Sequence, residues 1–259
     1  MLLTERQLEW ELTREPAGRS GAANMTIDAS LLAEAARSGR SFLRLYRFDP
    51  PCLSLGRNEA ARAHYDHTAI ARLGLDVVRR PTGGGAVWHE HEVTYAVAAP
   101  IARFGGLRAA YHAIHARLAA ALQTLGVATT LAPDRPTARL PDRRSSCFAT
   151  PVGGEVLVGG RKVVGSAQVR EGRAFLQHGS ILLDGSQDLV RLVSREPSVP
   201  GSETTLSAAL GRPVSFEEVA DAVIEVFGDV GAQHAAPLPS DGPAVRRSVF
   251  QDPDWTWRR

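Results

Sequence analysis

The chain has 259 residues, a length that fits one large domain or a domain with a small appendage. Hydrophobic residues make up 44% and charged residues 22%, as in a globular protein with a sizeable core. The 30 basic and 28 acidic residues leave a net charge of +2, which gives no reason to expect nucleic-acid binding. No apolar run reaches the roughly 18 residues of a membrane span, and the N-terminus lacks a secretory apolar core. We therefore expect a cytoplasmic protein without a membrane partner.

The first third of the chain alternates helix and strand signals. Asn24 is placed to cap a helix over residues 25–39, which Gly39 ends. The runs that follow are a strand at 41–48, a strand at 51–56, a short helix at 67–74 and a strand at 75–80.

The middle of the chain holds a glycine-rich loop and a long helix. Residues 81–100 begin as the loop and finish as a strand. Residues 107–126 have helical spacing, and we assign His112 and His115 to the surface of that helix. The residues expected on its buried face are Tyr111, Ile114, Leu118, Leu122 and Leu125.

The last third predicts a meander, a helix and a tail. Strands at 154–160, 161–170 and 173–183 are joined by tight glycine turns. Ser215 and Glu218 have capping-box spacing at the start of a helix. Strand meanders with helices laid on one side indicate an α+β fold, a mixed or antiparallel sheet with flanking helices. We expect residues 1–230 to form one domain. Residues 231–259 would be a loosely ordered or docked tail, with Trp255 and Trp257 as the docking residues.

The stretch GGRKVVGSAQ, residues 159–168, holds the only lysine of the chain. Lys162 is there either by chance or because the position needs a compact ammonium rather than a planar guanidinium. Strand alternation places Lys162 and Ser166 on one face, and Gly165 and Ala167 on the other. The small side chains on that second face allow either close packing of another element or a narrow channel. A lysine beside such a channel would suit an acyl carbonyl or a phosphate.

A second stretch that suggests a binding site is RRPTGGGAVWH, residues 79–89. Its three glycines let the backbone approach a ligand and present N–H groups to an anion or a carbonyl oxygen. A glycine bulge that curves the sheet is the alternative. No Lys-Ser/Thr follows the glycines and no helix opens after them, so neither nucleotide-loop motif is present. For Arg79 and Arg80, a surface pair is the simpler explanation.

The two cysteines and eight histidines suggest a nucleophile but no metal site. Cys52 lies in a strand and fits a small buried hydrophobe. Cys147 lies in a polar loop after two arginines, where positive charge favours the thiolate. The histidines show no metal-ligand spacing. His178 lies on the strand next to Lys162 and is a candidate for lining the same cleft.

At these residues the sequence resembles the lipoate–protein ligase and octanoyltransferase superfamily, which shares a catalytic fold with biotin–protein ligases. The resemblance implies that residues 1–230 form an acyltransferase catalytic domain in which the Lys162 ammonium holds the acyl carbonyl oxygen. Four blocks carry the resemblance: NMTIDASLL (24–32), RRPTGGGAVWHEHEVTYAV (79–97), SSCFATP (145–151) and GRKVVGSAQVREGRAFLQHGSILL (160–183). The substrate-binding residues implied are Arg80, Thr82, Gly83, Gly84, Gly85, His89, Gly165, Ser166, Ala167 and His178.

Within this superfamily, the position of the cysteine favours acyl transfer over ligation. Cys147 precedes the lysine strand, as in one branch of cysteine-dependent octanoyltransferases, and would be the nucleophile. ATP-dependent ligases commonly carry an Asn-Asp pair about where Gly154 and Glu155 fall, and often an accessory C-terminal domain. This chain has neither, although some ligases keep that domain on a separate chain. The resemblance therefore implies no cofactor and no metal.

The function we expect is transfer of an octanoyl group from acyl carrier protein, through a Cys147 thioester, to a lipoyl-domain lysine in lipoate biosynthesis. The acceptor would be glycine cleavage H protein or an E2 subunit, and His89 or His178 would be the general base. Three alternatives remain: an amidotransferase between lipoyl domains, an ATP-dependent lipoate ligase with Cys147 incidental, and a non-catalytic module that binds a carrier protein. Chain-length preference, oligomeric state and the role of the DWTWRR tail stay open at this point.

Overall fold

The computed structural model describes residues 9–134, 148, 153–195, 203–228, 233–234 and 248–258. Cys147 lies outside these residues, as does most of the segment around it. Within the described part of the chain, no helix is both long and apolar enough to cross a bilayer.

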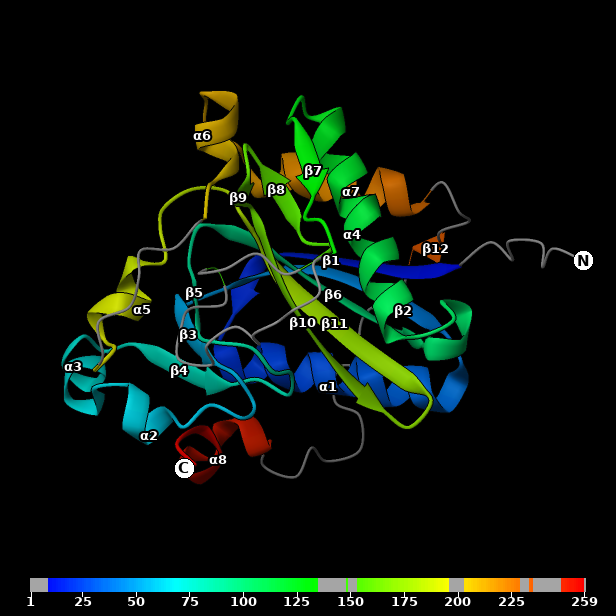
Figure 1. The fold of residues 1–259 in the computed structure, drawn as a ribbon. Coiled ribbons are helices and arrows are strands. Elements are labelled where there is room, and N and C mark those ends of the chain that lie inside the picture. The colour runs from blue at the N-terminus through cyan, green and yellow to red at the C-terminus, as the bar shows by residue number, and fades with distance from the viewer. Residues whose placement is uncertain are drawn as a thin grey trace, which may run out of the picture.

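A mixed sheet, here called the main sheet, forms the centre of the molecule (Figure 1). The β1–β2 and β1–β12 pairs are parallel, whereas β2–β6, β6–β11 and β10–β11 are antiparallel. The α+β prediction with a mixed sheet is confirmed. In spatial order, the strands seen among the described residues are β10 (Val164–Glu171), β11 (Ala174–Leu182), β6 (Glu92–Pro100), β2 (Ser41–Phe48), β1 (Trp10–Arg19) and β12 (Gln233–His234).

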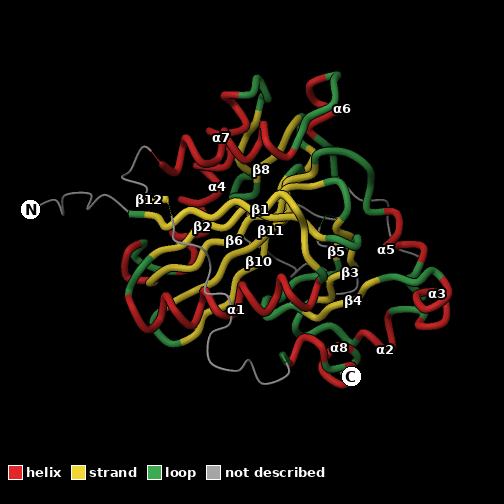
Figure 2. Tube along the Cα trace, turned by 180° about the vertical axis from the view of Figure 1, so that it is seen from behind, coloured by secondary structure: helices red, strands yellow, loops and turns green. Residues whose placement is uncertain are grey.

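Helices cover both faces of the main sheet, so the expectation that they lie on one side is wrong. Figure 2 shows α1 (Gly21–Ser38) on one side and α4 (Leu107–Thr124) with α7 (Phe216–Gly228) on the other. The strands alternate accordingly, because successive side chains point to opposite faces. On β2, Phe42 and Tyr46 pack with α1, while Leu43 and Leu45 pack with α4 and α7. The inner strands β2, β6 and β11 are therefore buried on both faces.

Two smaller sheets flank the main sheet and carry the loops of interest. The first contains β3 (Cys52–Leu55) between β4 (Asp76–Arg79) and β5 (Val87–His89). The second contains β8 (Val156–Val158) between β7 (Thr129–Leu131) and β9 (Arg161–Lys162). The strand expected over residues 161–170 is therefore broken at Val163, where the chain leaves one sheet and joins the main sheet.

Helix α1 begins earlier than the sequence indicates. Ser20 is its N-cap and accepts a hydrogen bond from the Ala23 N–H at 3.4 Å. Asn24, expected as the cap, is instead buried in the first turn, where its amide donates to the Arg19 and Arg47 carbonyls. The expected end is confirmed, because Gly39 has a φ of 75° and caps the helix.

The start of α7 has the predicted cap, because the Glu218 N–H donates to the Ser215 hydroxyl at 3.1 Å.

The other helices are short, and the C-terminal tail contributes one of them. The tail returns to the fold: the Trp255 indole N–H donates to the Arg79 carbonyl at 3.0 Å, and the Trp257 ring lies 3.8 Å from that of His67. The short elements are α2 (Ala61–His64), α3 (His67–Arg72), α5 (Asp188–Leu192), α6 (Leu206–Leu210), α8 (Pro253–Thr256) and 3-10 turns at Ile101–Arg103 and Val249–Gln251.

Candidate active site

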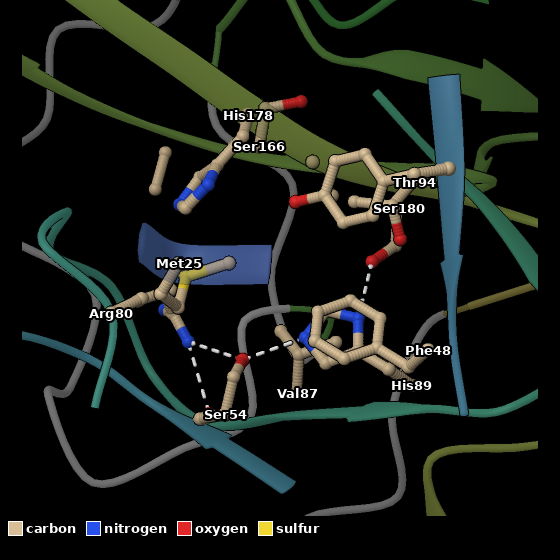
Figure 3. Close-up of a pocket in the computed structure, with 14 residues that line it drawn as sticks. Met25, Phe48, Ser54, Arg80, Val87, His89, Thr94, Ser166, His178 and Ser180 are labelled. Carbon is tan, nitrogen blue, oxygen red and sulfur yellow. Dashed lines mark hydrogen bonds between the residues drawn. The ribbon is translucent and has the colours of Figure 1, made fainter. Parts of the chain in front are cut away.

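A narrow pocket lies where α1, the main sheet and the β4–β3–β5 sheet meet (Figure 3). Its volume is about 20 Å³, room for about one water molecule. Segments far apart in the sequence converge on it, including the predicted residues Arg80, His89, Gly165, Ser166, Ala167 and His178. The other lining residues were not predicted from the sequence: Met25, Tyr46, Phe48, Ser54, Val87, Thr94, Gly179 and Ser180.

Arg80 holds the glycine loop in place. Its side chain is buried, and Nη1 donates to the Ser54 carbonyl and hydroxyl, both at 3.0 Å. Nη2 donates to the carbonyls of Gly83 at 2.8 Å and Gly85 at 2.6 Å. Between them Gly84 has a φ of 87°, a conformation that a side chain would strain. One guanidinium therefore fixes the loop between Arg80 and Val87, which both line the pocket, whereas the predicted residues Thr82, Gly83, Gly84 and Gly85 are not among its lining residues.

The surface assignment of Arg79 and Arg80 is wrong. Both are buried, and Arg79 points away from the pocket to the C-terminal tail. Arg79 Nε donates to the Trp255 and Thr256 carbonyls at 3.0 Å, and Nη1 donates to the Gly56 carbonyl at 2.7 Å. Two adjacent arginines thus tie the glycine loop and the tail to the same strand end.

His178 connects the pocket to a buried ion pair under α1. Its Nδ1 lies 2.8 Å from Asp28 Oδ2, and its Nε2 lies 2.6 Å from the Thr82 hydroxyl. Burial lowers the pKa of His178, so the neutral ring with hydrogen on Nδ1 satisfies both contacts. Burial opposes ionisation of Asp28, but the His178 hydrogen bond and the Arg44 charge hold the pKa of that carboxyl below its usual value.

His89 occupies a matching position on the other wall. Its ring stacks on Phe48 with the centroids 4.1 Å apart. Nδ1 lies 2.6 Å from Glu92 Oε1, and Nε2 lies 2.7 Å from the Ser54 hydroxyl. Both predicted pocket histidines therefore have a carboxylate on Nδ1, an arrangement that fixes the ring and makes Nε2 the basic nitrogen.

Lys162 is almost fully buried beside the pocket. Its Nζ donates to Glu155 Oε1 at 2.6 Å, and the Tyr111 hydroxyl donates to the same oxygen at 3.1 Å. The ammonium also lies 5.3 Å from the ring centroid of Phe148. Glu155 was noted in the sequence only as a departure from the ligase Asn-Asp pair. In the structure, the Glu155 carboxylate accepts a hydrogen bond from the ammonium of Lys162, the only lysine in the sequence.

Gly165 makes room for the aromatic ring next to this lysine. A Cβ at Gly165 would lie 2.6 Å from Phe148 Cζ, closer than real contacts allow. The close packing predicted for the thin face of this strand is confirmed. Because the strand breaks at Val163, however, Lys162 and Ser166 lie on different sheets and not on one face of one strand.

His115 was assigned to the helix surface, and this is wrong. The side chain is fully buried, with Nε2 2.8 Å from the Ser166 hydroxyl, which in turn lies 2.6 Å from the Tyr95 hydroxyl. Burial and then the Lys162 charge lower the pKa of His115 to about 3, so the ring is neutral at physiological pH. The spacing contained the signal, since His115 is four residues after Tyr111 and three before Leu118 on the apolar face.

Neither Cys52 nor a metal centre belongs to the site that the described residues form. Cys52 is buried, as expected, and burial raises the pKa of its thiol well above the usual value, which removes it as a nucleophile at neutral pH. The described residues include no cluster of histidine, cysteine and carboxylate side chains that could hold a metal ion.

Known proteins are similar to this chain in sequence and in fold. The family model of the lipoyl protein ligase A/B catalytic domain matches residues 20–228. Octanoyltransferase LipM of Moorella thermoacetica is 39% identical over 76% of this chain and 73% of its own length. Octanoyltransferase LipM of Symbiobacterium thermophilum is 38% identical over 85% of this chain and 86% of its own.

Among solved structures, lipoate-protein ligase A bound with ATP superposes with a TM-score of 0.76 at 20% identity, covering 96% of this chain and 98% of that one. A bi-partite lipoate protein ligase with its E2 lipoyl domain, from Thermoplasma acidophilum, gives a TM-score of 0.69 at 18% identity, with 96% of each chain covered. At these identities the structures support the fold alone. With the family match and the curated relatives, they confirm the expected resemblance: the chain belongs to the lipoyl protein ligase A/B catalytic domain family.

Proposed function

We propose that this protein is an octanoyltransferase of lipoate biosynthesis, which moves an octanoyl group from acyl carrier protein to a lysine of a lipoyl domain. The acceptor is glycine cleavage H protein or a related E2 domain, and the intermediate is a thioester on Cys147. Two relatives over most of the chain carry the name octanoyltransferase. The observation that carries the mechanism is the position of Phe148, the residue after Cys147, against Lys162 and Gly165.

The reaction needs two acyl transfers and no activating cofactor, because a thioester is already activated. The Cys147 thiolate attacks the octanoyl carbonyl, the carrier thiolate leaves, and the leaving sulfur takes up a proton. The acceptor amine then attacks the enzyme thioester, loses a proton and releases Cys147. In both tetrahedral intermediates the Lys162 ammonium, oriented by Glu155, stabilises the oxyanion.

The pocket supplies the remaining parts of this mechanism. His89 and His178, each with a carboxylate on Nδ1, are the candidates for accepting the proton of the amine. An eight-carbon chain needs more than the 20 Å³ present, so lining side chains must move when it binds. Met25 is the most adaptable of them, because its unbranched thioether has three rotatable bonds. Arg80 is held by four hydrogen bonds and is the lining residue we expect to move least.

A cysteine nucleophile also has a consequence for location. The thiolate must stay reduced between turnovers, which a cytoplasmic environment provides. We therefore include a cytoplasmic location in the proposal.

The test is intact-mass analysis after the protein is mixed with octanoyl-carrier protein without ATP. We expect an octanoyl adduct that hydroxylamine removes and that Cys147→Ala abolishes. Cys52→Ala is the matched control and should keep the adduct, since the Cys52 thiol is buried and protonated. Activity that appears only with ATP and free acid would instead make the protein a ligase. Binding of carrier protein without any adduct or turnover would support the non-catalytic module.

A further inference from the structure

Behind the glycine loop, on the side away from the acyl pocket, lies a second hollow. Its volume is about 340 Å³, and it is lined by Arg57, Asn58, Glu59 and Arg258. Arg57 and Asn58 are exposed, and none of the carboxylates in the described residues lies within 4.0 Å of the Arg57 side chain. Arginines at a hollow suit a phosphate, which a guanidinium can bind through two parallel hydrogen bonds.

The hollow is packed directly against the wall of the acyl pocket. The Arg57 N–H donates to the Thr82 carbonyl at 2.8 Å, while the Thr82 hydroxyl lies 2.6 Å from His178 Nε2 in the pocket. The neighbouring Gly56 is so close to the loop that a Cβ there would lie 1.9 Å from the Gly84 carbonyl oxygen. One layer of backbone therefore separates the two sites.

The C-terminal tail places the second arginine of the hollow. Arg258 Nη2 donates to the Arg57 carbonyl at 2.8 Å, and its guanidinium lies 3.7 Å from the Trp255 ring centroid. Arg79 Nη2 holds the Arg258 carbonyl at 3.1 Å from within the fold. The tail is thus fixed so that a guanidinium lies beside Arg57, at the end of the molecule where Figure 1 shows α2, α3 and α8 together.

The one acidic side chain lining this hollow is turned away from it. Glu59 is buried, its Oε2 accepts from the Gly56 N–H at 2.6 Å, and its Oε1 accepts from the Tyr65 hydroxyl at 2.8 Å. Among the described residues that line the hollow, an entering anion would therefore meet the side chains of Arg57, Asn58 and Arg258.

We propose that the hollow of Arg57, Asn58 and Arg258 binds the phosphate of the donor's phosphopantetheine arm. The proposal rests on the proposed function, since it gives the acyl donor a second point of attachment. A thioester donor carries this phosphate on the arm that delivers the acyl group, whereas the acceptor lysine carries none. The hollow therefore belongs to the donor half of the reaction, and the tail is part of the donor site.

The test measures kcat/KM for formation of the enzyme adduct with octanoyl-carrier protein, octanoyl-CoA and octanoyl-pantetheine. The first two carry the phosphate and the third does not. Arg57→Ala and Arg258→Ala should each lower kcat/KM roughly tenfold or more for the phosphate-bearing donors. With octanoyl-pantetheine they should change it less than about twofold. Arg170→Ala, which removes an exposed arginine at the far end of β10, should leave all three donors unaffected.

Other outcomes would overturn the proposal in distinct ways. Equal losses on all three donors would mean that the arginines only support the glycine loop. A loss confined to octanoyl-carrier protein would mean that they contact the acidic protein surface and not the phosphate. If the wild-type protein forms no adduct with any donor, the proposed function fails first and this inference with it. Since Arg57 is exposed, Arg57→Ala remains a fair test even if Arg258→Ala loosens the tail.

Discussion

The two faces of the main sheet have different interiors. The face under α4 and α7 is a continuous apolar cluster that includes Trp10, Leu118 and Phe227. The face under α1 has a smaller apolar cluster and, beside it, buried charges: Asp28 accepts from Arg44 at 3.0 Å and from Tyr46 at 2.8 Å. The α1 face reaches the pocket through His178, whereas the α4 face reaches it through His115, which contacts the pocket residue Ser166. The comparison indicates that one face mainly stabilises the fold, while the other gives up some apolar burial to position the site.

The strongest test of this division removes bulk from the apolar face. Phe227 is fully buried and packs against Trp10 with the ring centroids 5.3 Å apart. Phe227→Ala should lower the free energy of unfolding by about 4 kcal/mol, measured by urea denaturation. At 25 °C the folded variant should keep kcat/KM for octanoyl transfer within about twofold. A large loss of activity in the folded variant would show that the two faces are not separate.

A change on the α1 face should instead affect both properties. Asp28→Asn removes the negative charge that pairs with Arg44 and places an amide NH2 next to the Arg44 guanidinium, itself a donor. This should lower the free energy of unfolding by about 3 kcal/mol. Because Asp28 also orients His178, kcat/KM should fall about tenfold. The matched control is Asp221→Asn, on an exposed carboxylate paired with Arg14. If Asp28→Asn keeps full activity, the buried charges are structural only.

The pH dependence of stability tests His115, the buried histidine of α4. Folded His115 is neutral at pH 7, with a pKa of about 3, whereas in the unfolded chain it has the ordinary histidine pKa of about 6.5. The unfolded state therefore binds more protons between these values, and stability is lost as the pH falls below 6.5. Between pH 7 and pH 5 the wild type should lose about 2 kcal/mol more than His115→Gln. His178 titrates in the same direction but is present in both proteins, so it cancels. If both proteins lost the same stability between pH 7 and pH 5, the neutral state of buried His115 would be contradicted.

The smallest expected effect concerns the contact between the glycine loop and the α1 face. Thr82→Val keeps the shape but removes the hydroxyl next to His178 Nε2. We expect a loss of about 1 kcal/mol in stability, and a comparable few-fold drop in kcat/KM. Thr68→Val, at an exposed position of α3, serves as the control. An unchanged rate would show that His178 needs only its Asp28 partner.

Much of the fold follows from local patterns, because periodicity and glycine punctuation act over a few residues. The strands at 41–48 and 174–182, and the extent of α4, were predicted from such patterns. Two local errors have a common cause. Asn24 is a residue type common at helix caps and His115 one common on surfaces. In the fold, however, both are buried and hydrogen-bonded to partners distant in sequence, the Arg47 carbonyl and the Ser166 hydroxyl.

The candidate site was only partly predictable for the same reason. The glycine loop and Lys162 stand out by composition, so the sequence indicates them directly. Glu155 and Asp28 do not stand out, since their importance comes from which cation or ring the fold brings to them. The break at Val163 could not be predicted either, because RKVVGSAQVR alternates as a single strand would. In the structure, the residues before Val163 pair in the β7–β8–β9 sheet and those after it pair in the main sheet.

The burial of Lys162 has a consequence for the chemistry of the protein surface. The sequence contains no other lysine, and this one is only 1% exposed. For an enzyme that passes acyl groups to lysine amines, the surface therefore presents guanidinium groups that do not act as nucleophiles and no lysine amine that does. In the proposed mechanism, the reactive thioester would have no exposed side-chain amine of the enzyme to acylate, which would protect the protein from self-modification and leave the incoming acceptor without competition.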